Sequence, residues 1–129
     1  MDFIGKNKSI DEVIAIEEGV VNGGGCIYVD ALLDNIVPVN SILGMALKAP
    51  MYRIVESCDI AFESIYQKLQ HESREMGFDA NTESIVNMYE TGIIDPVKTV
   101  RLALLNAVSV AQLYLMTDCV IVPEEMKLN

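Results

Sequence analysis

Hydrophobic residues three and four positions apart recur along most of this chain, and the segments between them are short and either polar or rich in glycine. Ser9 followed by Glu12 has the spacing of a capping box, so a first helix is predicted from Ser9 to Val21. Asn-Gly-Gly-Gly at 22–25 then ends it. Glycine adopts positive φ and lets another group approach the backbone closely, so this run is a candidate site.

More helices are predicted after the glycine run. One covers 26–35. The segment 40–58 has a helical pattern interrupted at Pro50, and because proline breaks or kinks a helix, two packed helical pieces are expected there. A further helix follows at 59–71, with Asp59 as its cap.

The helical pattern then stops at the polar segment 73–82, which indicates a loop or a short hairpin. A short helix is predicted at 82–91, and Gly92 suits its left-handed cap. Asp95-Pro96 is typical of a helix start, because aspartate accepts hydrogen bonds from free amides and proline has no amide to lose.

The longest helix is expected from Pro96 to about Met116, and a helix of this length spans roughly 30 Å. It is predicted to be the core helix, with an apolar stripe along one side. Cys119 to Val122 is a β-branched run that predicts a strand ended by Pro123, and no neighbouring strand is predicted that could pair with it. The stripe consists of Val97, Val100, Leu104, Ala107, Val108, Ala111 and Leu115.

The predicted fold class is therefore mainly α, with a short loop or hairpin near 77–81 and a terminal strand. At 129 residues the chain is long enough for one domain with a real core and too short for two. Hydrophobic residues make up 51% of it, which suggests that part of its apolar surface contacts a partner. The net charge of -10 argues against binding to nucleic acid or to an anionic membrane surface.

Composition also excludes several kinds of site. The three cysteines, Cys26, Cys58 and Cys119, lie far apart, so neither a disulfide framework nor a zinc site is indicated and a reducing compartment fits best. The amino terminus has no secretory pattern. The longest uncharged stretch, 102–117, is shorter than the roughly 18 residues of a membrane span. His71 is the single histidine, which leaves little support for a hydrolase built on a histidine base.

Three blocks of sequence occur in order along the chain. Glu-Glu-Gly-Val-Val-Asn-Gly-Gly-Gly stands at 17–25, Ala-Leu-Lys-Ala-Pro-Met-Tyr-Arg-Ile-Val at 46–55, and Gly-Phe-Asp-Ala followed by Gly-Ile-Ile-Asp-Pro within 77–96. Together they resemble the last part of the GroEL-type group I chaperonins, over residues 10–123. The resemblance implies the C-terminal half of the equatorial, ATP-binding domain of a protein-folding chaperone. Three further matches follow the last block: Lys98, Arg101 and Ala103.

The resemblance also implies which residues would contact a nucleotide. The family's glycine triplet near the phosphates and ribose matches 23–25, its base-contacting loop matches 79–81, and its ribose-binding carboxylate matches Asp95. Two isoleucines are expected beside the base. The candidate residues are Gly23, Gly24, Gly25, Ile54, Asp79, Ala80, Asn81, Ile93 and Asp95. The implied cofactor is ATP or ADP with Mg²⁺ in a complete family member, with weak or no binding to this chain alone, and no metal ligand is assigned.

The same residues have simpler interpretations. A glycine run between two helices is often only a flexible turn. Asp95 is more often a helix cap than a ligand, although one carboxylate oxygen could cap while the other accepts from a ribose hydroxyl.

The chain also departs from the family pattern. Asn7 stands where the resemblance places the aspartate that activates water, and an amide cannot act as a general base, a role that contributes about 100-fold to 10,000-fold in rate. Asp2 and Asp11 are nearby but in the wrong register, and residues 1–8 match poorly. The family's Gly-Asp-Gly-Thr-Thr phosphate loop does not occur in these 129 residues. No catalytic residue is therefore assigned, and the whole chain, 1–129, is expected to be a single partial domain.

Two functions remain open. The first is a chaperonin equatorial fragment, from a split gene or a degenerate paralogue, whose partners are other chaperonin subunits in a homo-oligomeric ring. Unfolded proteins and a co-chaperonin are expected only for a complete member. The second is a helical interaction or assembly protein derived from a chaperonin that binds no nucleotide. The expected compartment is the cytoplasm, with a mitochondrial or plastid matrix as the alternative.

Overall fold

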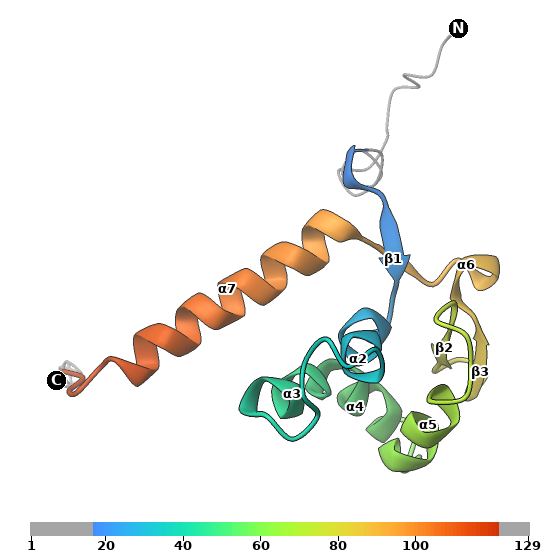
Figure 1. Ribbon diagram of the computed structural model, residues 1–129, viewed down its shortest axis with the longest axis horizontal. Coiled ribbons are helices and arrows are strands. Elements are labelled where there is room, and N and C mark those ends of the chain that lie inside the picture. Colours follow the sequence, from blue (N-terminus) through green and yellow to red (C-terminus); the bar gives the residue numbers. More distant parts are fainter. Residues whose placement is uncertain (1–16, 122–129) are drawn as a thin grey trace, which may run out of the picture.

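The computed structural model describes residues 17–121. Figure 1 shows a compact body and one long helix, α7, that projects away from it. In chain order the elements are β1 (Val20–Asn22), α2 (Cys26–Leu33), α3 (Ile42–Leu47), α4 (Ala49–Glu56), α5 (Phe62–Leu69), β2 (Met76–Asp79), β3 (Ser84–Asn87), α6 (Met88–Thr91), β4 (Ile94–Pro96) and α7 (Val97–Leu115). The prediction of a mainly α fold with a short hairpin is confirmed.

The core of the body lies where α2, α4 and α5 meet β2 and α6. Helical spacing explains which residues enter it: Met51 and Val55 are four residues apart on α4, and Ile65 and Leu69 are four apart on α5. The side chains of each pair therefore lie on one face, which the helix buries. The buried cluster consists of Cys26, Val29, Met51, Val55, Phe62, Ile65, Tyr66, Leu69, Phe78 and Met88.

The predicted division of 40–58 into two helices is confirmed, with the boundary two residues earlier than expected. Ser41 caps α3 by accepting a 2.9 Å hydrogen bond from the amide of Gly44. The break falls at Lys48, and Pro50 lies in the first turn of α4. Proline is tolerated there because its missing amide would have had no helical partner.

The helix predicted at 59–71 is shorter than expected. Asp59 does not cap it, because its backbone lies in the left-handed region at φ 57° and Ala61 takes the cap position of α5. The helix predicted at 26–35 ends at Leu33.

The segment 73–82 forms part of a hairpin, which is one of the two structures predicted for it; the other was a loop. Strand β2 pairs antiparallel with β3, with Phe78 opposite Ile85. The predicted helix at 82–91 is therefore wrong over 84–87, where pairing with β2 overrides the local helical pattern. Helix α6 occupies only the end of that range, and it closes at Gly92, which has the predicted left-handed conformation at φ 75°.

A second two-stranded sheet joins β1, near the start of the described residues, to β4, immediately before α7. Strand β1 pairs antiparallel with β4, with Val21 opposite Asp95. The prediction that the first helix continues through Val20 and Val21 is wrong, because Gly19, at φ 85°, turns the chain into β1. The earlier part of that helix, 9–16, lies outside the described residues.

The same sheet moves the start of α7. Asp95 and Pro96 belong to β4, and α7 begins at Val97, whose amide donates to the carbonyl oxygen of Gly19 at 3.1 Å. The prediction that Asp95 caps this helix is wrong, because no side chain caps α7.

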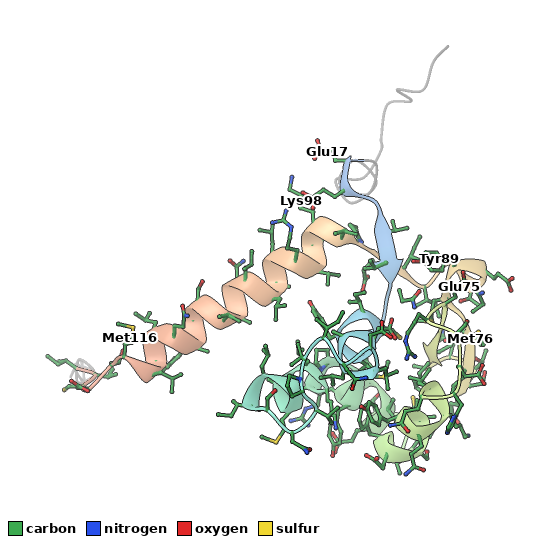
Figure 2. All side chains as sticks on the ribbon, viewed as in Figure 1. Glu17, Glu75, Met76, Tyr89, Lys98 and Met116 are labelled. Carbon is green, nitrogen blue, oxygen red and sulfur yellow. The ribbon has the colours of Figure 1, made fainter. Side chains whose placement is uncertain are left out.

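Helix α7 ends within a residue of the predicted boundary, but the prediction that it forms the core is wrong. None of its side chains is buried by the described residues. Its hydrogen bonds and ion pairs with the rest of the described residues lie in its first turns, where the Tyr28 hydroxyl donates to the carbonyl oxygen of Val100 at 2.9 Å and Arg101 pairs with Glu18 at 2.9 Å. In Figure 2 Glu17 and Lys98 lie together at this base, 3.5 Å apart at Oε2 and Nζ, while Met116 lies at the far end of the helix.

The strand predicted at Cys119 to Val122 is absent over 119–121, the part of it that the structure describes. Cys119, Val120 and Ile121 are exposed and belong to no strand, and Val122 lies outside the described residues. Over residues 17–121, no helix is both long enough and apolar enough to cross a membrane.

Candidate functional site

The glycine run at 23–25 connects β1 to α2 and lies against two other segments. The Gly23 amide donates to the carbonyl oxygen of Ile93 at 2.9 Å, and a Cβ placed on Gly23 would lie 3.1 Å from that oxygen. A Cβ on Gly25, whose φ is 77°, would lie 2.9 Å from the Met51 nitrogen on α4. Gly23 therefore needs glycine for close backbone approach, and Gly25 needs it for close approach and for its positive φ.

Gly24 faces the place where α4 and the hairpin meet. A Cβ on Gly24 would lie 4.0 Å from Ile54 Cδ1 and 3.8 Å from the carbonyl oxygen of Phe78. The Met88 methyl group is also 3.8 Å from that point. The absence of a side chain at Gly24 thus leaves a small space bordered by apolar atoms and one carbonyl oxygen.

The tip of the hairpin is organised by a buried carboxylate. Asp79 is 8% exposed, and its Oδ1 accepts from the Asn81 amide at 2.9 Å while its Oδ2 accepts from the Thr82 hydroxyl at 2.9 Å. These bonds hold Ala80 and Asn81 on the surface at the turn. Asp79 therefore shapes the tip, and the exposed atoms of Ala80 and Asn81 are the ones that a ligand can reach.

One thiol links the hairpin tip to α4. Cys58 Sγ lies 3.6 Å from the carbonyl oxygen of Ile54 and 3.8 Å from that of Ala80. This role could not be predicted from sequence, because a lone cysteine between two helices has no motif around it. Cys58 thus places Ile54 beside the predicted base-contacting loop.

Asp95 lies on β4, one strand away from the glycine run. Partial burial raises the pKa of its carboxyl group, and its charge in turn raises the pKa of the Tyr28 hydroxyl, for which burial is the larger cause. The carboxylate does not cap α7, so both of its oxygens remain available to a ligand such as a sugar hydroxyl.

The predicted site residues are therefore close neighbours in the fold, although they are spread over more than seventy positions of sequence. Gly23 contacts Ile93, Gly24 faces Ile54, and Cys58 joins Ile54 to Ala80. Sequence reasoning missed Phe78 and Met88, which close the space beside Gly24. Both side chains lie in the buried core, so the only sign of them in the sequence was that these positions are hydrophobic.

The predicted catalytic position cannot be placed, because Asn7, like Asp2 and Asp11, lies outside the described residues. Within 17–121, no group of three or more histidine, cysteine or acidic side chains is arranged to hold a metal ion.

A second feature is an apolar groove of about 660 Å³ between α7 and the body. On α7 it is lined by small and aliphatic side chains, and on the body by residues of α2, α3 and α4. The volume is of the order that protein pockets and helix-binding grooves have. The lining consists of Tyr28, Ile42, Leu43, Ala46, Leu47, Pro50, Ala103, Leu104, Ala107, Val108 and Ala111.

Comparisons with known proteins agree with one another. Residues 12–125 match the model of the TCP-1/cpn60 chaperonin family. The chain is 39% identical to the protein called chaperonin GroEL, chloroplastic, of Cyanidium caldarium, over 89% of this chain and 24% of that protein. Its fold is similar to the crystal structure of a group III chaperonin in the open state, with a TM-score of 0.68 and 24% identity, over 84% of this chain and 25% of that one. The chain thus spans about a quarter of the length of the proteins that it matches.

Proposed function

The chain belongs to the TCP-1/cpn60 chaperonin family, and from that membership we propose that it is the C-terminal half of the equatorial domain of a group I chaperonin. In this role it carries part of an ATP site and contacts other subunits in an assembly that folds proteins. The observation that carries the proposal is the gathering of Gly24, Ile54 and the hairpin tip around one small space.

The residues next to that space carry groups that the base and ribose of a nucleotide could contact. Ile54 and Ile93 offer apolar atoms to the faces of a ring, and Ala80 and Asn81 offer exposed polar atoms to its edge. Asp95 can accept hydrogen bonds from ribose hydroxyls. The glycine run would lie near the phosphates of a bound nucleotide. The nucleotide supplies these phosphates for hydrolysis.

Binding by this chain alone is expected to be weak. The Gly-Asp-Gly-Thr-Thr phosphate loop is not among the 129 residues, so charge-assisted phosphate contacts worth roughly 1.5 to 3 kcal/mol each are lost. Calorimetry should give dissociation constants no tighter than about millimolar for ATP, with little preference over adenosine. Micromolar binding that requires the γ-phosphate would contradict this.

The location of the site is tested separately by NMR. Adenosine at millimolar concentration should shift the amide signals of Gly24, Ala80 and Asn81, and Asp95→Ala should weaken these shifts. Asp118→Ala is the matched control, because Asp118 lies beyond α7, far along the chain from β4. The nucleotide proposal fails if those three signals do not move in the parent chain.

We also expect no magnesium-dependent ATPase activity from the chain alone, because Asn7 stands at the position of the presumed base. The measurement is steady phosphate release against a buffer blank. Turnover that Asp95→Ala abolishes would show this expectation to be wrong.

The second candidate is a helical assembly protein that binds no nucleotide. Asn7 favours it, and so does α7, which exposes apolar side chains along its length. Under this proposal the groove accepts helices of a chaperonin subunit, while the glycine run is only a turn. The adenosine titration separates the two candidates, because only the first predicts shifts at the hairpin tip.

The partners follow from the same premise. We propose that the apolar groove and α7 are covered by other parts of a chaperonin subunit or ring, and that unfolded proteins and a co-chaperonin are bound only by the complete assembly. For the compartment, the chloroplastic relative supports a plastid matrix, with a mitochondrial matrix or the cytoplasm as the other two candidates.

A further inference from the structure

The apolar groove between α7 and the body has exposed side chains in both of its walls. In the body wall Ile42 is 86% exposed and Leu43 is 44% exposed. In the α7 wall Ala107 and Val108 lie at the centre of the lining and are exposed too. The groove volume of about 660 Å³ equals roughly one to one and a half turns of a helix with its side chains, so the groove can seat part of a helix.

The other side of α7 is also apolar and uncovered. Leu102, Leu105 and Leu113 are 41%, 52% and 69% exposed, and no side chain of α7 is buried by the described residues. At 3.6 residues per turn these leucines lie on the side of the helix that faces away from the groove. A partner therefore has two apolar sides of α7 to cover, as well as the body wall of the groove.

We propose that the groove is filled by α7 of a second copy of this chain, in a reciprocal dimer with two-fold symmetry. The two α7 helices run antiparallel and meet through their groove sides. Ala107 lies near the two-fold axis, because it is the midpoint of the α7 lining, 103–111. The leucine side of each α7 contacts Ile42 and Leu43 of the other copy. This one arrangement fills both grooves and covers both sides of both helices.

The area that such a dimer buries is sufficient for a stable interface. Helix α7 has 19 residues, and a helix of that length is about 28 Å long and about 10 Å wide. Covering both of its sides, together with the body wall of the groove, buries on the order of 800 Å² per copy. Specific protein interfaces typically bury about that area on each partner.

The charges of α7 fit an antiparallel pair of helices. Lys98 and Arg101 lie in its first turns, residues 102–117 carry no charge, and Asp118 is exposed beyond its far end. Figure 2 shows Lys98 and Met116 at opposite ends of the helix. In the dimer the cationic end of each helix lies near Asp118 and the negative end of the dipole of the other helix. The apolar interface between them then contains no charged side chain.

The dimer requires no nucleotide, so its test is independent of the ATP proposal. A single copy with an exposed α7 prevails below the dissociation constant. Sedimentation equilibrium of the whole chain should therefore fit a monomer and a dimer, with a dissociation constant of about micromolar. A chain that stays monomeric at higher concentrations, or that forms species larger than two copies, would overturn the proposal.

Two substitutions test the two sides of α7. Ala107→Glu and Leu105→Glu each place a charge on one covered side, and each should raise the dissociation constant at least about tenfold. Neither side chain is buried in a single copy, so both variants should keep the circular dichroism of the parent chain. Tyr89→Glu is the matched control, because Tyr89 is 48% exposed on α6, away from α7 in Figure 2, and it should leave the constant unchanged. If Leu105→Glu dimerises like the parent, the reciprocal arrangement is wrong.

Disulfide trapping tests the antiparallel register. In a Cys119→Ser background, Ala107→Cys should give a covalent dimer on copper-catalysed oxidation, because the two introduced thiols lie together at the two-fold axis. Ser109→Cys, on the side of α7 away from the groove, should give little covalent dimer. Mass spectrometry measures both yields. Equal cross-linking of the two variants would mean that the helices do not meet through their groove sides.

Discussion

The body of the molecule and helix α7 have the same kind of hydrophobic pattern, but the apolar side chains are buried only in the body. In the body, α4 and α5 bury Met51, Val55, Ile65 and Leu69. In α7, which is more than twice as long as either, no side chain is buried by residues 17–121. Apolar residues at helical spacing therefore predict that one face of a helix is buried, but they do not identify the surface that covers it.

The distribution of apolar residues on α7 indicates how it is covered in an assembly. Ala107 and Val108 face the groove, while Leu102, Leu105 and Leu113 fall on the other side of the helix at 3.6 residues per turn. A helix that is apolar on both sides is typical of an interior position. We therefore expect α7 to be contacted by partner segments on both sides.

The largest expected effect on the free energy of unfolding tests whether the body alone stabilises the fold. Met51→Ala removes a side chain that is 0% exposed, and loss of its contacts together with the cavity should cost about 3 kcal/mol. Leu105→Ala, at a position 52% exposed, should cost less than about 1 kcal/mol. Urea unfolding of both variants measures the free energies. Equal costs would mean that α7 is buried in solution.

A second contrast uses the cysteines of the two regions. Burial raises the pKa of the Cys26 thiol to about 11, while Cys119, beyond α7, is exposed. A rise from 9.0 leaves about a hundredfold less thiolate at pH 8, so alkylation of Cys26 should be at least that much slower than that of Cys119. Timed iodoacetamide labelling with mass spectrometry gives both rates. Comparable rates would show that the body opens readily.

The glycine run should be less tolerant than a glycine outside it. Gly25→Ala combines a positive φ with a clash against α4 and should cost about 2 kcal/mol or more. Gly19→Ala is the matched control, because φ there is 85° but nothing lies within 4 Å of the added methyl group, so it should cost about 1 kcal/mol. Thermal unfolding compares them, and an equal loss would deny the close packing at Gly25.

The smallest expected effect concerns association through the end of the chain. The chain should sediment as species larger than a monomer at micromolar concentration, and Ile121→Lys should weaken that association by about tenfold, since it places a charge on a residue 91% exposed at an apolar surface. Ile36→Lys, on the body at 74% exposure, is the control and should leave the distribution unchanged. A monomer that neither substitution alters would overturn the expectation.

Local physics allowed several features to be predicted correctly from sequence. Proline and glycine act within one or two residues, so the division at Pro50 and the left-handed end at Gly92 were predictable. Among the residues selected by resemblance to a family, Gly23 contacts Ile93 and Gly24 faces Ile54. That these residues bind a nucleotide stays a prediction. Non-local pairing could not be predicted in the same way. Strand β4 has a helix-start motif and becomes a strand because the distant β1 pairs with it. Strand β3 has a helical pattern and becomes a strand because it pairs with β2, its neighbour in the hairpin.

Helix breaks at proline and glycine, and the apolar face of each helix, could be predicted from the sequence because backbone propensity and side-chain spacing are properties of a short segment. Contacts between distant segments were needed to hold Asp79 within the hairpin tip, to bring the Asn22 amide to the carbonyl oxygen of Arg74, and to leave α7 extending away from the body. These outcomes depend on which segments distant in sequence supply the partner for each hydrogen bond and each apolar face. Such partners are chosen by the free energy of the whole packed structure, which no single segment contains.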